Sequence, residues 1–293
     1  MLIISPFTDP YKNLALEEYI LKNLVLNETI LFLWQNDSSV IIGRNQNIYE
    51  EVNLLYTKEH AIPVIRRKSG GGTVYHDLGN INYSVIADKT GYVKAYEKLT
   101  KPVVDFLISL GLEAHFFGKS DIYIGNTKIS GNAQYLFGNR ILHHGTLLFN
   151  SNLETLNLVL KNKQAISSTS VKSNRALVGN ISDYINLSLA DFKNKMISHF
   201  NMPIYTLTEL DIAHSTLLMN TYQSYEWNYG ESPTFKIHKE SNHYLVNLTI
   251  VKGIIVAGLI AYNNSPLSLP YLNKPFHPDT FSDYLELKNI LFE

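Results

Sequence analysis

The chain contains no cysteine among its 293 residues. This absence excludes disulfides, thiolate metal sites and every mechanism that uses a thiol nucleophile. An excess of charge of one sign is also lacking, since the formal net charge is −1. A nearly neutral chain has no electrostatic basis for nonspecific binding to nucleic acid, so any basic site must be local. We therefore expect no nucleic-acid partner.

Long hydrophobic runs are missing as well, because no stretch approaches the ~18 uninterrupted apolar residues that a membrane span needs. The N-terminus, Met-Leu-Ile-Ile-Ser-Pro-Phe, has neither the charged leader of a secretory signal nor the arginine-rich character of a transit peptide. We expect a cytoplasmic protein with no membrane partner. The hydrophobic content of 45% with 17% charged residues is ordinary for a folded protein, and the length allows one large domain and a small one.

The pattern of residues predicts both helices and strands. Asp9-Pro10 is typical of a helix N-cap followed by a first-turn proline. After residue 233 the composition changes to short alternating strands, so we predict a catalytic domain at 1–233 and an accessory domain at 234–293. The accessory part is marginal for an independent core and should dock on the main domain. The other expected elements are strands at 29–34, 39–42, 81–86 and 141–149 and helices at 52–59, 94–110 and 278–291.

Three consecutive glycines lie between two predicted strands, in the run Arg-Arg-Lys-Ser-Gly-Gly-Gly-Thr-Val-Tyr-His-Asp-Leu-Gly-Asn (66–80). Ordering three glycines costs backbone entropy, so they make sense where a Cβ could not fit. Successive N–H groups of such a loop can form a concave anion site, and the guanidinium groups of Arg66 and Arg67 add full charges. The run therefore suits a phosphate ester beside an apolar group. A sharp turn that needs glycine is the structural alternative.

A second informative segment is Asp-Ile-Tyr-Ile-Gly-Asn-Thr-Lys-Ile-Ser-Gly (121–131), where Gly-Asn between β-branched runs predicts a two-residue hairpin. With the turn at 125–126, Tyr123 pairs with Lys128, and Asp121 pairs with Ser130. These four side chains share one face, and Asp121 lies diagonally from Lys128, close enough to share a ligand or a metal. An exposed hairpin with a solvated lysine is the alternative, and a register shift of one residue would undo the grouping.

Several other side chains have both a structural and a chemical interpretation. His76 forms a structural hydrogen bond or takes part in a site, and Arg44 reaches a phosphate or only ends a strand. Trp34 is a core residue or the wall of a pocket. The adjacent His143 and His144 point to opposite faces of a strand, so a shared metal site is not expected.

Taken in order, these segments resemble the lipoate–protein ligases, within the wider group of biotin and lipoate ligases. The resemblance covers essentially the whole chain, and the number of ordered matches makes chance negligible. The matching segments are Asp-Pro-Tyr-Lys-Asn-Leu-Ala-Leu-Glu-Glu (9–18), Leu-Phe-Leu-Trp-Gln-Asn (31–36), Ile-Ile-Gly-Arg-Asn-Gln-Asn (41–47), the run at 66–80, Thr-Lys-Ile-Ser-Gly-Asn-Ala (127–133), His-His-Gly-Thr-Leu-Leu (143–148) and Ser-Tyr-Glu-Trp-Asn-Tyr-Gly (224–230).

The resemblance implies an α+β fold: a large catalytic domain on a mixed sheet flanked by helices, with a small C-terminal α+β accessory domain, in a protein that we expect to be a monomer. It implies that lipoate and ATP give lipoyl-adenylate, whose acyl group passes to a lysine of a lipoyl domain in a 2-oxoacid dehydrogenase complex or of the glycine-cleavage H protein. The implied ATP and adenylate residues are Arg67, Gly71, Gly72, Thr73, Val74, Tyr75, Lys128, Lys172 and Arg175. The implied lipoate residues are Trp34, Arg67, Gly72, His76, Lys128, His144 and Gly145, and Asp121 is the candidate ligand of Mg²⁺.

The resemblance implies a catalytic role for Lys128, and elementary chemistry agrees with it. Attack of a carboxylate on the α-phosphate accumulates negative charge, which Lys128, Arg67 and a magnesium ion would stabilise. The loop that holds Lys172 and Arg175 departs from the family pattern, which is richer in arginine there, so these two residues are tentative assignments.

Three other functions compete with this one. A transferase that accepts preformed lipoyl- or octanoyl-adenylate without ATP stays open, although one that forms an acyl-thioester would need a cysteine. A biotin ligase is disfavoured, because its familiar glycine-rich signature differs from the run at 66–80. A catalytically idle binding protein is disfavoured by the presence of both Lys128 and the glycine loop.

Overall fold

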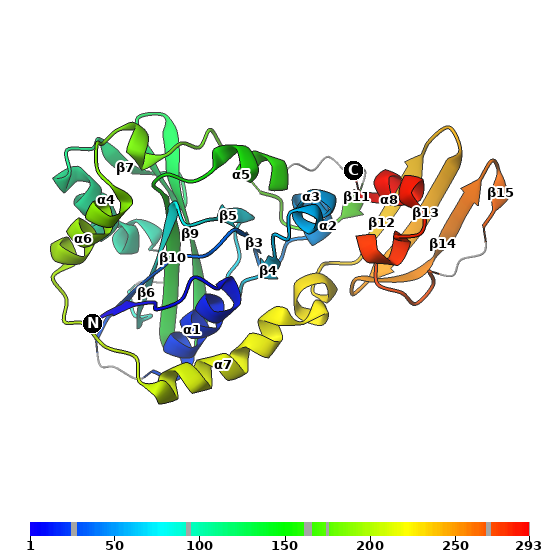
Figure 1. Ribbon diagram of the computed structural model, residues 1–293. Helices are drawn as coiled ribbons and strands as arrows, with labels where there is room; N and C mark the ends of the chain where they lie inside the picture. The colour runs from blue at the N-terminus through cyan, green and yellow to red at the C-terminus, as the bar shows by residue number, and fades with distance from the viewer. Residues whose placement is uncertain (25–27, 92–94, 161–165, 174–175, 268–270, 293) are drawn as a thin grey trace.

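The computed structural model describes residues 1–24, 28–91, 95–160, 166–173, 176–267 and 271–292. It confirms an α+β fold with one large sheet and a second, smaller sheet formed mostly by the C-terminal residues. Figure 1 shows the large sheet with its helices at one end of the molecule, near the N-terminus, and the strands after residue 234 at the opposite end.

The large sheet has seven strands in the order β1-β2-β6-β10-β9-β8-β7. Only β1 and β2 are parallel, and every other neighbouring pair is antiparallel, so the sheet is mixed as predicted. Its strands are β1 (Leu2–Ile4), β2 (Ile30–Trp34), β6 (Asn80–Asp88), β7 (Ala114–Phe117), β8 (Asp121–Ile124), β9 (Thr127–Phe137) and β10 (Arg140–Leu148).

Helices cover both faces of this sheet, because side chains along each strand alternate between two buried clusters. In β2, Ile30, Phe32 and Trp34 pack toward α1 (Pro10–Lys22) and α7 (Glu209–Gln223), whereas Leu31 and Leu33 pack toward the opposite side. The opposite side is covered by α4 (Tyr96–Ser109) and α6 (Leu189–Phe200). Helix α1 begins as predicted, since the Asp9 carboxylate accepts hydrogen bonds from the N–H groups of residues 11 and 12.

A separate three-stranded sheet carries the glycine loop. Its centre is β3 (Ser39–Ile42), with β4 (Val64–Arg66) parallel on one side and β5 (Val74–His76) antiparallel on the other. The loop runs from β4 to β5. Arg66, fully buried at the end of β4, directs its guanidinium away from the loop and donates to main-chain carbonyl groups of Gly43, Arg44, Gln46, Trp227 and Asn228. Arg66 therefore joins neighbouring segments instead of adding charge to the loop.

The C-terminal residues dock on the main part of the chain, as expected. The strands β12 (Phe235–Glu240), β13 (Tyr244–Val251), β14 (Ile254–Tyr262) and β15 (Ser265–Pro266) form a sheet with β11 (Ile166–Ser168), which comes from before residue 233. Their inner face shares one hydrophobic cluster with residues far earlier in the chain, including Val40, Ile42 and Tyr49. A common core of this kind explains how 60 residues are stabilised without a large core of their own.

Two predicted helices differ from the observed elements. The helix expected at 52–59 is α3 (Leu54–Glu59), which begins two residues later than predicted because Val52 is extended and the Asn53 side chain caps α3; the short helix α2 (Ile48–Glu51) before it was not predicted. The helix expected at 278–291 is a 3₁₀ turn, η3 (Pro278–Phe281), followed by α8 (Leu285–Phe292). The remaining elements are α5 (Leu153–Val159), η1 (Ile181–Asp183) and the π-helical turn η2 (Glu226–Gly230).

Candidate active site

The three positions of the glycine loop differ in their need for glycine. Gly71 has φ +89°, a conformation that side chains with a Cβ rarely adopt. A Cβ on Gly72 would lie 3.0 Å from Ser173 Oγ, whereas a Cβ on Gly70 would meet nothing within 4 Å. The expectation that the loop needs glycine is therefore confirmed at Gly71 by its backbone conformation and is wrong for Gly70, whereas a Cβ on Gly72 would make a tight contact with Ser173.

The Arg67 side chain stabilises this loop through hydrogen bonds. Its Nη2 donates to the carbonyl oxygens of Gly70 at 2.6 Å and Gly72 at 2.8 Å, and its Nη1 donates to Ile41 O at 3.0 Å. Its Nε donates to Ser69 Oγ at 2.9 Å. Burial lowers the pKa of Arg67 to about 10, so the group remains a cation near neutral pH.

A chain of buried polar groups continues from Ser69 behind the site. Ser69 Oγ lies 2.6 Å from His144 Nε2, and Glu17 Oε1 accepts from His144 Nδ1 at 2.8 Å and from Ser84 Oγ at 2.6 Å. Ser84 Oγ in turn accepts the indole N–H of Trp34 at 2.9 Å. The polar atoms of the Trp34 and His144 rings are therefore all directed into the protein.

His143 lies on the other face of β10 from His144, as predicted. Its Nε2 is 3.1 Å from Thr100 Oγ1 on α4, and burial lowers its pKa to about 3. Among the described residues, no group of three or more His, Asp or Glu side chains could hold a metal ion.

Lys128 and Asp121 meet on the hairpin, as the sequence predicts. Lys128 Nζ lies 2.9 Å from Asp121 Oδ2, and Ser120 Oγ donates to Asp121 Oδ1 at 3.0 Å. The predicted pairing of Tyr123 with Lys128 is confirmed, but the predicted pairs of residues 121 and 122 are wrong. An irregularity between Ile122 and Tyr123 places Ser130 opposite Ile122 and Gly131 opposite Asp121. Ser130 is consequently buried and does not share a face with Asp121 as predicted.

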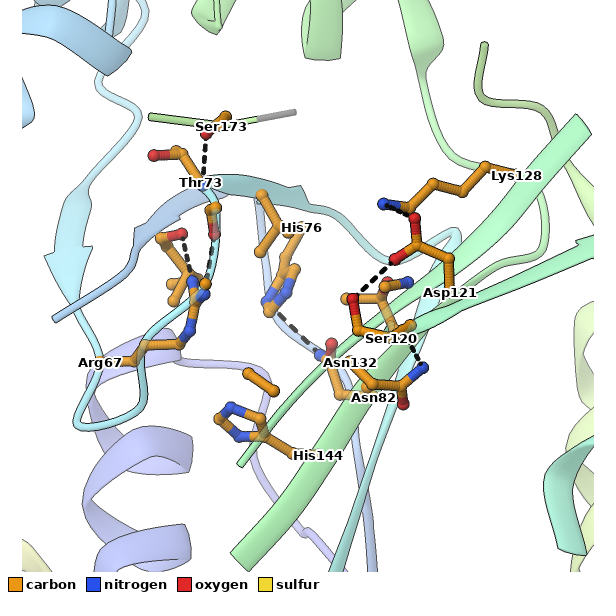
Figure 2. A pocket seen from close by; sticks show the side chains of 18 of the residues that line it. Arg67, Thr73, His76, Asn82, Ser120, Asp121, Lys128, Asn132, His144 and Ser173 are labelled. Atoms are coloured by element: carbon orange, nitrogen blue, oxygen red, sulfur yellow. Dashed lines mark hydrogen bonds and ion pairs between the residues drawn. The ribbon is translucent and has the colours of Figure 1, made fainter. Parts of the chain in front are cut away.

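Two adjoining cavities, of about 300 and 410 Å³, open on this set of side chains. Figure 2 shows how the loop residues Arg67 and Thr73 face Asp121 and Lys128 across the first cavity, with His76 between them. Lys128 lines both cavities and so stands at their junction. Both are also lined by Thr73, Val74, Gly131, Thr146, Lys172 and Ser173.

Nearly all of the predicted site residues come together here. Tyr75 lines the second cavity, and Arg175 lies outside the described residues. Arg44 does not line either cavity: its Nη1 is 2.7 Å from Glu231 Oε2, and its guanidinium stacks on the Trp227 ring at 4.6 Å. The first cavity is lined by Trp34, Arg67, Gly71, Gly72, Thr73, Val74, His76, Asp121, Lys128, His144, Gly145 and Lys172.

The segment at 168–173 contacts the glycine loop, and the sequence analysis did not predict these contacts. Ser173 Oγ donates to Glu51 Oε2 at 2.5 Å and accepts from Thr73 N at 2.9 Å and Gln46 Nε2 at 3.0 Å. Lys172 is exposed, and its Nζ lies 3.7 Å from Glu50 Oε1. In the sequence, the feature that could have indicated these contacts is the pair of glutamates at 50–51, just before the predicted 52–59 helix.

No helix within the described ranges is long and apolar enough to cross a bilayer. Residues 9–201 match the family described as the lipoyl protein ligase A/B catalytic domain. Lipoate–protein ligase 1 of Staphylococcus aureus is 42% identical over 242 residues, which cover 80% of this chain and 74% of that protein.

Solved structures show the same relationship. A lipoate protein ligase from T. acidophilum with bound lipoic acid has a TM-score of 0.67 and 30% identity, covering 78% of this chain and 98% of that one. A bipartite ligase from the same organism, described with its E2 lipoyl domain, has a TM-score of 0.69 and 30% identity over 82% of this chain and 97% of that one. Lipoate-protein ligase A bound with ATP has a TM-score of 0.67 and 31% identity over 78% and 98%. The chain therefore belongs to the lipoate–protein ligase family.

Proposed function

We propose that this protein activates lipoate with ATP to lipoyl-adenylate and then transfers the lipoyl group to a lysine of an acceptor domain. The observation that carries this proposal is the position of Lys128 at the junction of two cavities. Relatives bound to lipoic acid and to ATP support the same pair of substrates.

The first cavity suits the acyl chain. Leu14, Trp34 and Ile41, which are buried, line this cavity and not the second one, and the side chains of Lys119, Lys128 and Lys172 are among its other lining residues. We place the aliphatic tail of lipoate beside the three buried residues and its carboxylate at Lys128, because an alkyl chain gains free energy on leaving water and a carboxylate gains it beside a cation.

The second cavity suits the nucleotide. Leu148, Leu156 and Leu160 provide apolar wall on which a base can pack, close to Tyr75 of β5. Thr73, at the end of the glycine loop, lines both cavities, so phosphates bound there would lie within reach of the loop and of Lys128. We assign Lys172 to the same phosphates.

In the first step, a carboxylate oxygen of lipoate attacks the α-phosphorus of ATP, and pyrophosphate leaves with the electrons of the broken P–O bond. The Lys128 ammonium stabilises the charge that accumulates on the phosphoryl oxygens. In the second step, the ε-amine of the acceptor lysine attacks the acyl carbonyl and loses a proton, and AMP leaves. Lys128 then polarises the carbonyl without acting as a nucleophile.

Asp121 is the proposed ligand of Mg²⁺. Magnesium is usually bound through one or two carboxylates together with substrate phosphates, and Asp121 offers one carboxylate at the rim of the first cavity. The donor set therefore fits. Bound there, the ion would neutralise charge on the ATP phosphates.

We propose lipoyl domains of 2-oxoacid dehydrogenase complexes, or the glycine-cleavage H protein, as acceptors. The T. acidophilum ligase described with its E2 lipoyl domain supports the first of these. We also propose that residues 234–293 form an accessory domain and that the enzyme is monomeric and cytoplasmic.

The decisive experiment is incubation with ATP, Mg²⁺, lipoate and a purified lipoyl domain, followed by intact mass measurement. We expect the acceptor to gain the mass of one lipoyl group only when ATP is present. A mass gain with synthetic lipoyl-adenylate but none with ATP and lipoate would show a transferase instead. ATP–pyrophosphate exchange that depends on lipoate isolates the first step, and Lys128→Ala is the matched negative control.

A further inference from the structure

The first cavity is lined by one side chain with a buried polar atom whose hydrogen bond is not made within the described residues. His76 lines the cavity and is 3% exposed, and its Nε2 has no hydrogen-bond partner among the described residues. Its neighbours differ in this respect, because both ring nitrogens of His144 and the indole N–H of Trp34 are occupied. An unpaired polar group in such a place is costly unless a ligand pairs with it.

The surrounding amides determine which nitrogen of His76 carries the proton. Asn13 Nδ2 donates to the main-chain carbonyls of Phe7 and Gln35, so this amide has one allowed orientation. Asn36 Oδ1 lies 2.9 Å from the same Nδ2, whose two hydrogens are shared among the three acceptors, and this turns Asn36 Nδ2 toward His76 Nδ1 at 3.1 Å. Nδ1 must then accept, and the proton of the neutral ring is on Nε2.

The ring is neutral at physiological pH. Burial, together with the positive charge of Arg67, lowers the pKa of His76 to about 3. The His76 ring meets the Trp34 ring edge-on, with 5.7 Å between the ring centroids, and Trp34 is one of the residues where we place the tail of the acyl substrate. His76 therefore offers a fixed, uncharged N–H donor beside the proposed tail.

We propose that His76 is a specificity-determining residue whose Nε2–H donates a hydrogen bond to a ring sulfur of lipoate and thereby favours this acid over sulfur-free acids of the same shape. This inference rests on the proposed acyl site. Divalent sulfur is a weak acceptor, but an alkyl ring would leave the donor with no partner at all. Since an unmade buried hydrogen bond typically reduces binding about 5- to 160-fold, we expect a preference near the low end, about tenfold.

The test compares lipoate with 5-cyclopentylpentanoate, which has the same chain and a five-membered ring of carbon. The measured quantity is the ratio of kcat/KM for the two acids in ATP–pyrophosphate exchange, in the wild type and in His76→Leu and His76→Gln. We expect the ratio to fall about tenfold in His76→Leu and to be largely kept in His76→Gln, which retains an N–H donor. The change should appear in KM for the acid, because a contact with the tail is made equally in the ground state and the transition state.

The ratio is taken on one preparation, so a smaller folded fraction in a variant lowers both rates equally and cancels. His143→Leu is the matched control, because His143 is also buried but faces α4 and does not line the cavity. An unchanged ratio in His76→Leu, or a wild type that does not distinguish the two acids, would overturn the inference while leaving the ligase activity intact. If neither acid supports exchange in the wild type, the acyl site itself is wrong and the inference fails with it.

Discussion

Acidification should destabilise this protein well above the pH at which carboxylates titrate. Three histidines are held neutral in the folded state: burial lowers the pKa of His76 and His143 to about 3 and that of His277 to about 4. In the unfolded chain each histidine titrates near ~6.5. Between these values the unfolded state binds more protons than the folded state, so the free energy of unfolding decreases as the pH falls.

The size of the effect follows from these values. At pH 5 an unfolded histidine is almost fully protonated and a folded one is not, which lowers the free energy of unfolding by about 2 kcal/mol per group relative to pH 8. Three groups give about 6 kcal/mol, a large part of the ~5–15 kcal/mol that stabilises an ordinary protein. Near pH 5 the dependence should approach about 4 kcal/mol per pH unit.

Urea unfolding between pH 8 and pH 5, followed by the fluorescence of Trp34 and Trp227, measures this dependence. His143→Gln removes one of the three groups and should reduce the slope near pH 5 by about one third. A free energy of unfolding that is flat between pH 7 and pH 5 would refute the reasoning, because it would mean that these rings are protonated in the folded protein.

Three further predictions concern the site. Lys128→Ala should remain folded but release pyrophosphate about 100- to 1000-fold more slowly, as expected on losing one electrostatic donor of about 2.7–4 kcal/mol, and a near-normal rate would exclude the proposed role. Asp121→Asn should require a higher concentration of Mg²⁺ for half-maximal exchange, and an unchanged requirement would remove Asp121 as the ligand. Gly71→Ala should lower the free energy of unfolding by at least about 1 kcal/mol because of its positive φ, whereas Gly70→Ala, with open space around it, should change it little.

The features that could be predicted from the sequence are those set by neighbours in the chain. The turn at 125–126 brings Asp121 and Lys128 together whether or not the register is regular, because the two residues lie close to the same tight turn. The cap at Asp9 and the opposite orientations of His143 and His144 are equally local. The irregular pairing beyond Tyr123 was not predictable, since a bulge depends on how the whole strand fits the sheet.

The features that escaped prediction join residues far apart in the sequence. Glu17 meets His144 across 127 positions, and Ser173 meets Glu51 across 122. Arg66 and Arg67 are adjacent and chemically identical, yet one binds the 226–230 turn and the other the glycine loop. Which arginine takes which role follows from the strand direction at the end of β4, and no pattern within the run at 66–80 contains that information.

The polar groups around the first cavity share one arrangement that bears on catalysis. An acyl-adenylating site must place an alkyl chain beside phosphates, and free polar groups along the chain's path would bind water that could hydrolyse the mixed anhydride. Here Arg67 is engaged by loop carbonyls, and His144 by Glu17 and Ser69. The Lys128 ammonium, one fifth exposed and held by the single carboxylate of Asp121, is a cation at the junction of the two cavities that can exchange its partner for a substrate at little cost. Apart from the His76 N–H, which the acyl tail itself would cover, these buried polar groups are thus engaged within the protein, and an exchangeable charge lies where bonds are made.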